Sequence, residues 1–344
     1  MASVFPGGSG AVPRPEESGR LRVEFSRNPN SFAIARYARV IPISRSPGLY
    51  PRLDNANAFR VSNSTDFIWP DGDDAPRGDA AKTEWVSFVT ERSSYPFEIG
   101  NKSINMSDIS DIVAANSRQM AQRAMTDRAV KMIDQVTDSN NWASNQFDTA
   151  ANIGGGIWAG STVANDYIRS TFDEVRNQIV FATGGAIGPR DLMCVVDPKG
   201  VETIVQSPEY KQYLVNHAQA INAAQNTEPF DSYGLLPRLY GIEMVVEDTV
   251  RNTAREGGTD STGYLLGGDG GTAFFVARPG DNVVGVEGAT DFSTLSVLAL
   301  EEFTVEEFSD PVNRRTAGRV VQDIKTEITA PAAGVVVTNI TTAA

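Results

Sequence analysis

Residues 107–136 read SDISDIVAANSRQMAQRAMTDRAVKMIDQV and make the most strongly helical stretch of the chain. Ser107 is suited to cap this helix, and Asp108 and Asp111 fall in its first turn, where the helix dipole favours anions. The pattern predicts a helix over 107–137, about 45 Å long, whose narrow apolar stripe packs against a sheet. The stripe consists of Ile109, Ile112, Val113, Met120, Ala124, Val130, Ile133 and Val136.

Downstream of this helix, strands and helices alternate. A second helix is predicted over 166–182 and ends at a Gly-Gly pair. The buried strand at 192–196 leads into two short helices, which begin at the Asp-Pro of 197–198 and the Ser-Pro of 207–208. Further strands are predicted in the remaining third of the chain, and they lie at 242–246, 262–268, 272–280, 293–310, 319–331 and 334–341.

The segment before the long helix has a different character. Residues 1–19 are rich in Gly, Pro and Ser, and the alternation over 21–43 predicts an extended arm and a strand. The runs AFRVSNSTDFIW (58–69) and TEWVSFVTERSSY (83–95) predict a hairpin whose long tip is charged. The two tryptophans that flank this tip either contact another chain or pin the hairpin to its own domain. The order of arm, hairpin, long helix, α/β block and late strands indicates an α+β fold.

Composition restricts the class of protein. A chain of 344 residues is long enough for two packed lobes. One cysteine allows neither an internal disulfide nor a thiolate metal site within the chain. No signal peptide and no run of apolar residues long enough to span a bilayer is found, so we expect no membrane association. The net charge of −13 combines +5 over residues 1–60 with −18 over the rest, which indicates an acidic body with a basic arm.

No catalytic constellation emerges from the sequence. His217 is the only histidine, and no nucleophile elbow accompanies it. The glycine clusters at 152–160 and 267–272 lack the residues of a phosphate loop, and the acids at 71–74 lack calcium-loop spacing. We therefore predict no catalytic residue, no cofactor site and no metal site. The helices also carry no basic stripe for nucleic acid.

The two acids at the end of one strand have either a catalytic or a structural role. In YGLLPRLYGIEMVVEDTV (233–250), a strand ends in Glu247 and Asp248. A pair of acids at a strand end is a place for a catalytic carboxylate. The alternative is that Ile242, Met244 and Val246 form the buried face of the strand and that both acids lie at its solvated end.

The order of these parts resembles the major capsid proteins of tailed bacteriophages, the Hong Kong ninety-seven fold that encapsulins share. In this resemblance the helix at 107–137 is the spine helix, and 313–341 supplies closing strands. The strand-to-helix transition MCVVDPKGVETI (193–204) and the stretches 235–250 and 263–280 match the axial domain. The similarity covers nearly the whole chain and rests on order and local pattern.

The resemblance implies a division of the chain into four parts. These are an N-terminal arm and first strand (1–47), an extended hairpin loop (48–95), a peripheral domain (96–189 and 291–344) and an axial domain (190–290). The expected contacts between subunits involve the arm, the hairpin and a late arginine cluster. The residues are Arg20, Arg22, Arg27, Trp69, Asp71, Asp73, Arg77, Lys82, Trp85, Arg314 and Arg315.

The implied function is structural rather than enzymatic. Such a chain assembles in the host cytoplasm into pentamers and hexamers of an icosahedral head, which encloses double-stranded DNA without reading its sequence. The short arm implies that scaffolding comes from a separate polypeptide or is not needed, and a portal and a decoration protein are the other partners considered. Two alternatives stay open: an encapsulin shell, and a soluble α/β enzyme that uses Glu247 or Asp248.

Overall fold

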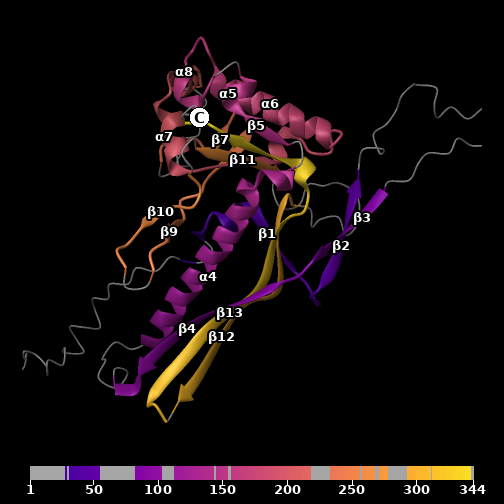
Figure 1. Ribbon diagram of the computed structural model, residues 1–344. Helices are drawn as coiled ribbons and strands as arrows, with labels where there is room; N and C mark the ends of the chain where they lie inside the picture. The colour runs from indigo at the N-terminus through magenta and orange to yellow at the C-terminus, as the bar shows by residue number, and fades with distance from the viewer. Residues whose placement is uncertain are drawn as a thin grey trace, which may run out of the picture.

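Two sheets and one long helix organise the protein (Figure 1). The computed structural model describes residues 28, 31–54, 82–102, 112–142, 145–153, 156–217, 233–255, 258–267, 271–277, 293–310 and 312–341. Two further pairs of strands project from this body on opposite sides (Figure 1). No helix in the described residues is long and apolar enough to cross a membrane.

The six-stranded sheet lies at the centre of the core. Its strands, in order, are β5 (Gln146–Asp148), β14 (Gly334–Thr338), β11 (Thr272–Ala277), β6 (Leu192–Val196), β8 (Ile242–Val246) and β7 (Arg238–Leu239). Every residue of β6 is buried. Because neighbouring side chains in a strand point to opposite faces, Cys194 packs in one apolar cluster while Met193 and Val195 pack in the other.

Helices cover one face of this sheet, as Figure 1 shows. They are α5 (Thr149–Asn152), α6 (Tyr167–Ala182), α7 (Pro198–Gln206) and α8 (Pro208–Asn216). The helix predicted over 166–182 is confirmed to within one residue, and both glycines after it adopt positive φ. Asp197 and Ser207 cap α7 and α8 through their side chains, as expected for these residue types.

The other face meets a four-stranded sheet and the long helix α4 (Ile112–Thr137). The strands are β1 (Ala38–Pro42), β12 (Leu295–Asp310), β13 (Arg315–Ile328) and β4 (Glu91–Gly100), in that order. Helix α4 lies against β13 and β4, where Tyr95 donates to Asp127 at 2.7 Å and Gln322 donates to Tyr95 at 2.8 Å. The predicted first turn of this helix, 107–111, lies outside the described residues.

Short single-turn helices connect these elements, and one of them follows the C-terminal end of α4 and caps it. They are η4 (Ser139–Trp142), η5 (Trp158–Gly160), η6 (Pro189–Asp191) and η7 (Pro331–Ala333). The last carbonyls of a helix have no partner within it. Here the buried indole of Trp142 donates to the Val136 carbonyl at 2.6 Å. Gly334 allows this packing, because a Cβ there would meet the Trp142 ring at 2.7 Å.

The structure differs from the sequence expectation in the first strand segment. We expected an extended chain over 21–43, but Ile34–Tyr37 forms the helical turn α2, and among the described residues of this segment the strand is β1, Ala38–Pro42. Ile34 and Tyr37 are three residues apart and both buried, so one helical turn directs both side chains into the core. Alternation of apolar and polar residues alone could not distinguish this turn from a strand.

The sequence made no prediction of the strand partners of β14 (Gly334–Thr338). The sequence placed 334–341 among the closing strands of the peripheral domain. In the structure β14 lies between β11 and β5, within the sheet that contains β6 and β8 of the predicted axial domain. Strand partners depend on contacts between distant segments, which the local pattern of β14 does not encode. The domain boundaries themselves stay a prediction.

The two projecting strand pairs are β2 (Gly48–Asp54) with β3 (Lys82–Phe88), and β9 (Val250–Asn252) with β10 (Thr262–Tyr264). The sequence predicted one continuous strand over 83–95. Instead β3 ends at Phe88, and β4 begins at Glu91 in a different sheet. The other predicted hairpin strand, 58–69, lies outside the described residues.

A buried carboxylate fixes the start of α6. The capping residue Asp166 makes no side-chain hydrogen bond. Its place is taken by Glu209 of α8, which accepts from the amides of Ile168 at 3.1 Å and Arg169 at 2.9 Å. Glu209 also accepts from the hydroxyls of Tyr240 at 2.6 Å and of Ser161. An anion at a helix N-terminus is stabilised by the free amides and the dipole, so Glu209 joins α6 to α8 and β7.

Replacing Glu209 with alanine tests this link. The change leaves buried donors without an acceptor, and we expect the free energy of unfolding to fall by about 3 kcal/mol. Urea unfolding of the dissociated chain measures it. The matched control is Glu202→Ala on the exposed side of α7, which should stay within about 0.5 kcal/mol of wild type. Equal effects of the two substitutions would contradict the assignment.

Candidate intersubunit surfaces and buried charges

The β2–β3 pair exposes an apolar face. Leu49 and Trp85 are 61% and 62% exposed. In the strand register Leu49 lies opposite Ser87 and Pro51 lies opposite Trp85, so these four residues share one face. The other face carries an Arg52–Glu84 ion pair at 2.9 Å and a contact between the Tyr50 and Phe88 rings.

A two-stranded pair is marginal on its own in water, and exposed aromatic side chains are typical of protein contacts. Trp85 was predicted to lie at such a contact or to pin the hairpin to its own domain. The exposure of Trp85 in the subunit favours the first alternative, and Trp69 lies outside the described residues. The contact with another subunit stays a prediction.

The predicted arginine cluster lies at the far end of the four-stranded sheet, in the turn between β12 and β13 (Figure 1). Arg314 is exposed and adopts a φ of 50°. Arg315 pairs with Asp310 at 3.0 Å and also with Glu98 of β4. The charge of Arg315 therefore already has partners within the chain. Its role between subunits is not tested by these contacts.

Most of the predicted contact residues lie outside the described residues. This holds for Arg20, Arg22, Arg27, Trp69, Asp71, Asp73 and Arg77. Lys82 begins β3 opposite Asp54, and its side chain is not part of the described structure.

The strand end at 247–248 corrects one expectation. We expected Glu247 and Asp248 at a solvated end, but Glu247 is fully buried. The hydroxyl of Tyr37 donates to its carboxylate at 2.7 Å, and the amide of Thr249 donates to it at 3.2 Å. Together with the ion pair between Arg36 and Glu243 at 3.1 Å, this contact ties α2 to β8. The sequence missed it because Tyr37 is 210 positions away.

Burial shapes the ionisation of this pair. Desolvation raises the pKa of Glu247, while the hydrogen bonds from Thr249 and Tyr37 oppose that shift. Desolvation and the neighbouring carboxylate also raise the pKa of the Tyr37 phenol. The partners of Glu247 are a phenol and a backbone amide, which suit a structural tie between two segments.

The single histidine lies apart from the buried acid Glu247 in the chain. His217 lies at the end of α8, where its ring stacks on Tyr213. No group of three or more His, Cys, Asp or Glu that could hold a metal is present among the described residues.

Comparison with known proteins identifies the fold. No protein-family model and no curated protein sequence matches the chain. Solved structures do match. A phage-related protein from Bordetella bronchiseptica RB50 aligns with a TM-score of 0.61 and 13% identity over 92% of this chain and 95% of that one. The capsid of the cyanophage P-SCSP1u aligns with a TM-score of 0.54 and 13% identity over 93% and 91%.

The chain has the fold of the tailed-phage major capsid proteins. The predicted α+β class is confirmed with it. An encapsulin complex from Synechococcus elongatus PCC 7942 shares the capsid fold, with a TM-score of 0.52 and 9% identity over 96% of both chains. The structural match thus extends over more than nine-tenths of the chain, although sequence identity is low.

The buried Glu247 predicts a specific pH dependence for this capsid-fold chain. A carboxyl group whose pKa is raised on folding stabilises the folded state. This contribution is fully present at a pH below 4.5, the pKa of the group in the unfolded chain. That contribution is lost as pH rises through the folded value. We expect Glu247→Gln to remove this loss, because glutamine carries no ionisable proton. Urea unfolding from pH 4.5 to about pH 8 measures the slope.

Tyr37→Phe serves as the matched variant for this measurement. The Tyr37 hydrogen bond lowers the pKa of Glu247, so its removal should make the loss of stability with rising pH steeper. A Glu247→Gln variant with the same pH slope as wild type would disprove the role assigned to this carboxyl group.

Proposed function

We propose that this chain is a structural shell protein, the major capsid protein of a tailed bacteriophage. Many copies assemble in the host cytoplasm into pentamers and hexamers of an icosahedral head, which encloses double-stranded DNA without sequence-specific binding. The observation that carries the proposal is the match to phage capsid structures over more than nine-tenths of the chain. The chain acts as a structural protein and not as an enzyme.

The exposed apolar face of β2–β3 supports this proposal. Closed shells repeat the same contacts around their symmetry axes. A projecting strand pair with Leu49 and Trp85 on one face supplies apolar area that a second copy can cover. The same argument applies to the predicted hairpin and arm residues, which we propose as contacts with neighbouring copies.

The acidic character of the chain suits a DNA container. Away from its first 60 residues the chain carries −18. Phosphate groups repel such a surface, so packaged DNA is not held tightly. We propose that scaffolding is supplied by a separate polypeptide, and that a portal and a decoration protein are further partners of the shell.

An encapsulin shell is the second candidate. The match to the Synechococcus elongatus encapsulin complex favours it, because the alignment extends over 96% of both chains. The two candidates differ in cargo, DNA in one case and an enzyme in the other. The nature of the enclosed material therefore separates them.

Assembly is the direct test of the proposal. Expressed together with its scaffolding partner, the chain should form closed shells that electron microscopy resolves as icosahedral particles. Nucleic acid inside particles from infected cells favours the capsid, and a protein cargo favours the encapsulin. A chain that stays monomeric under all these conditions would contradict both.

Trp85→Ser tests the apolar face of β2–β3. The side chain is exposed in the subunit, so its loss should change subunit stability by less than about 0.5 kcal/mol. The yield or stability of shells should fall strongly, since buried aromatic residues dominate many interfaces. The matched control is Val163→Ser, at a residue that is 64% exposed on the α/β block. Shells of normal stability from Trp85→Ser would remove this face from the assembly contacts.

A further inference from the structure

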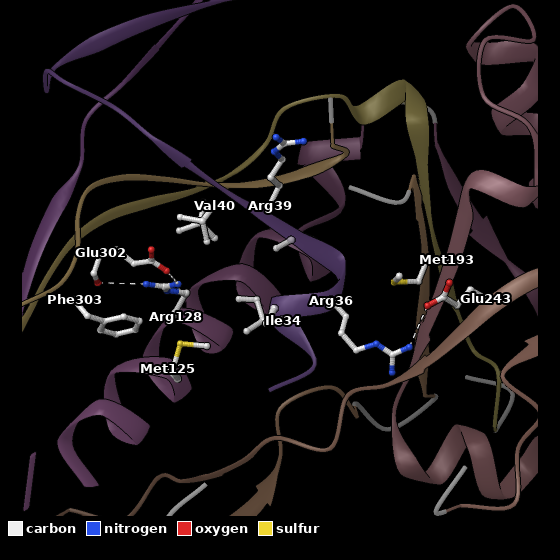
Figure 2. A pocket seen from close by; sticks show the side chains of 13 residues that line it. Ile34, Arg36, Arg39, Val40, Met125, Arg128, Met193, Glu243, Glu302 and Phe303 are labelled. Atoms are coloured by element: carbon white, nitrogen blue, oxygen red, sulfur yellow. Dashed lines mark hydrogen bonds and ion pairs between the residues drawn. The ribbon is translucent and has the colours of Figure 1, made fainter. Parts of the chain in front are cut away.

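A cavity of about 740 Å³ opens where α2, β1, α4, β8 and β12 meet. Figure 2 shows Arg128, Glu302 and Phe303 at one end and Arg36 with Glu243 at the other. Its volume falls within the range of small-molecule pockets in proteins. Part of its lining comes from α2 and β1, which lie in the predicted arm and first strand.

Arg128 is the unusual group in this cavity. Its side chain is only 4% exposed. The guanidinium donates to the carboxylate of Glu302 at 3.2 Å and to the backbone carbonyl of Glu302 at 3.4 Å. It also lies over the ring of Phe303, 4.5 Å from the centroid. Its Nε, which is buried, has no hydrogen-bond partner in the described structure.

An unmatched donor on a buried cation is costly, and such groups normally find a partner. The single carboxylate that pairs with Arg128 belongs to Glu302, whose side chain is 52% exposed. Water can therefore compete for that pair. Burial lowers the pKa of Arg128, which reflects the same incomplete compensation of its charge. A second anion beside the guanidinium would supply an acceptor for the unmatched donor and would compensate more of the positive charge.

The remainder of the lining is partly charged and partly apolar. Three arginines, at positions 36, 39 and 128, face two glutamates, at positions 243 and 302. The apolar part consists of Ile34, Val40, Met125, Met193, Val297 and Phe303. An inorganic anion would contact only the charged part of the lining, whereas a ligand with an anionic head and an apolar tail contacts the charged part and the partly exposed Val40 and Phe303 as well.

We propose that this cavity binds a free amphipathic carboxylate, with its head on Arg128 and its aliphatic tail on the apolar lining. The head accepts from the buried guanidinium, including the unmatched Nε. The carboxylate of Glu302 competes with the head for the same guanidinium. Its half-exposed side chain can turn outward to water when the ligand binds. This activity is independent of shell assembly.

Sodium octanoate is the probe, and isothermal titration calorimetry of the purified full-length chain is the measurement. Octanoate should bind at least about tenfold more tightly than octan-1-ol, because a hydrogen bond to a charged group has that effect. Along the series butanoate, hexanoate and octanoate, affinity should rise about fourfold per buried methylene. Inorganic phosphate should bind more weakly than octanoate.

Two variants test the role of Arg128. Arg128→Met should reduce the affinity for octanoate to that for octan-1-ol. Glu302→Gln removes the competing charge from a half-exposed position and should tighten octanoate binding severalfold. Circular dichroism checks that each variant is folded. If Arg128→Met does not fold, the affinity of Glu302→Gln for octanoate and the affinities of wild type across the ligand series still test the proposal.

Several outcomes would overturn the proposal. They are no octanoate binding by wild type, equal affinity for octanoate and octan-1-ol, and Glu302→Gln binding octanoate no more tightly than wild type. The titration is repeated on assembled particles and on the dissociated chain. Binding confined to the dissociated chain would also overturn it, because a neighbouring copy would then be the occupant.

Discussion

Phe274 and Phe275 are neighbours in β11, yet they pack in different cores. Phe275 meets Phe172 of α6 edge-on at 5.0 Å, and Phe274 meets Tyr37 of α2 edge-on at 5.4 Å. The six-stranded sheet is thus buried on both faces, and the two cores share it. A one-residue slip of β11 would exchange the two rings. The positions of the covering helices, of the long helix and of the first strand all depend on this register.

Buried charged side chains lie where helices and strands contact one another. Glu209 joins α6 to α8 and β7, and Glu247 joins α2 to β8. Buried ionic groups are weak evidence for stability, because their desolvation is costly. Here these carboxylates specify how the elements are arranged, since each accepts hydrogen bonds from donors that only one arrangement of helices brings together. Arg128 differs from both, because one of its donors has no partner in the described structure.

The exposed surfaces fall into two chemical types. On β4, Tyr95, Phe97 and Ile99 face the core, and the residues between them are exposed. The exposed residues of the four-stranded sheet carry cross-strand ion pairs such as Arg315–Glu98 and Arg319–Glu306. Surface pairs of this kind contribute little stability and keep a face solvated. The apolar face of β2–β3 has no such covering. A fold that phage capsids share therefore presents both a solvated sheet face and an apolar one.

The sequence by itself determined the elements whose signals are local. The starts of α7 and α8 follow from capping residues and prolines, and the end of α6 follows from a glycine pair, and these signals act within one helical turn. The five apolar residues of β6 predicted a strand buried on both sides. The order of such elements was also sufficient to predict the capsid fold.

Only the tertiary structure decided which strands pair and which polar groups are buried. Strand β14 joins β11 and β5, and Glu247 is buried because Tyr37, 210 positions away, lies over it. Arg128 was not singled out from the sequence, and its contacts with Glu302 and Phe303 arise from the approach of β12. The physical reason is the same in each case. Helix ends and side-chain periodicity are set by neighbours in the chain, whereas burial and strand pairing are set by segments that meet only when the chain folds.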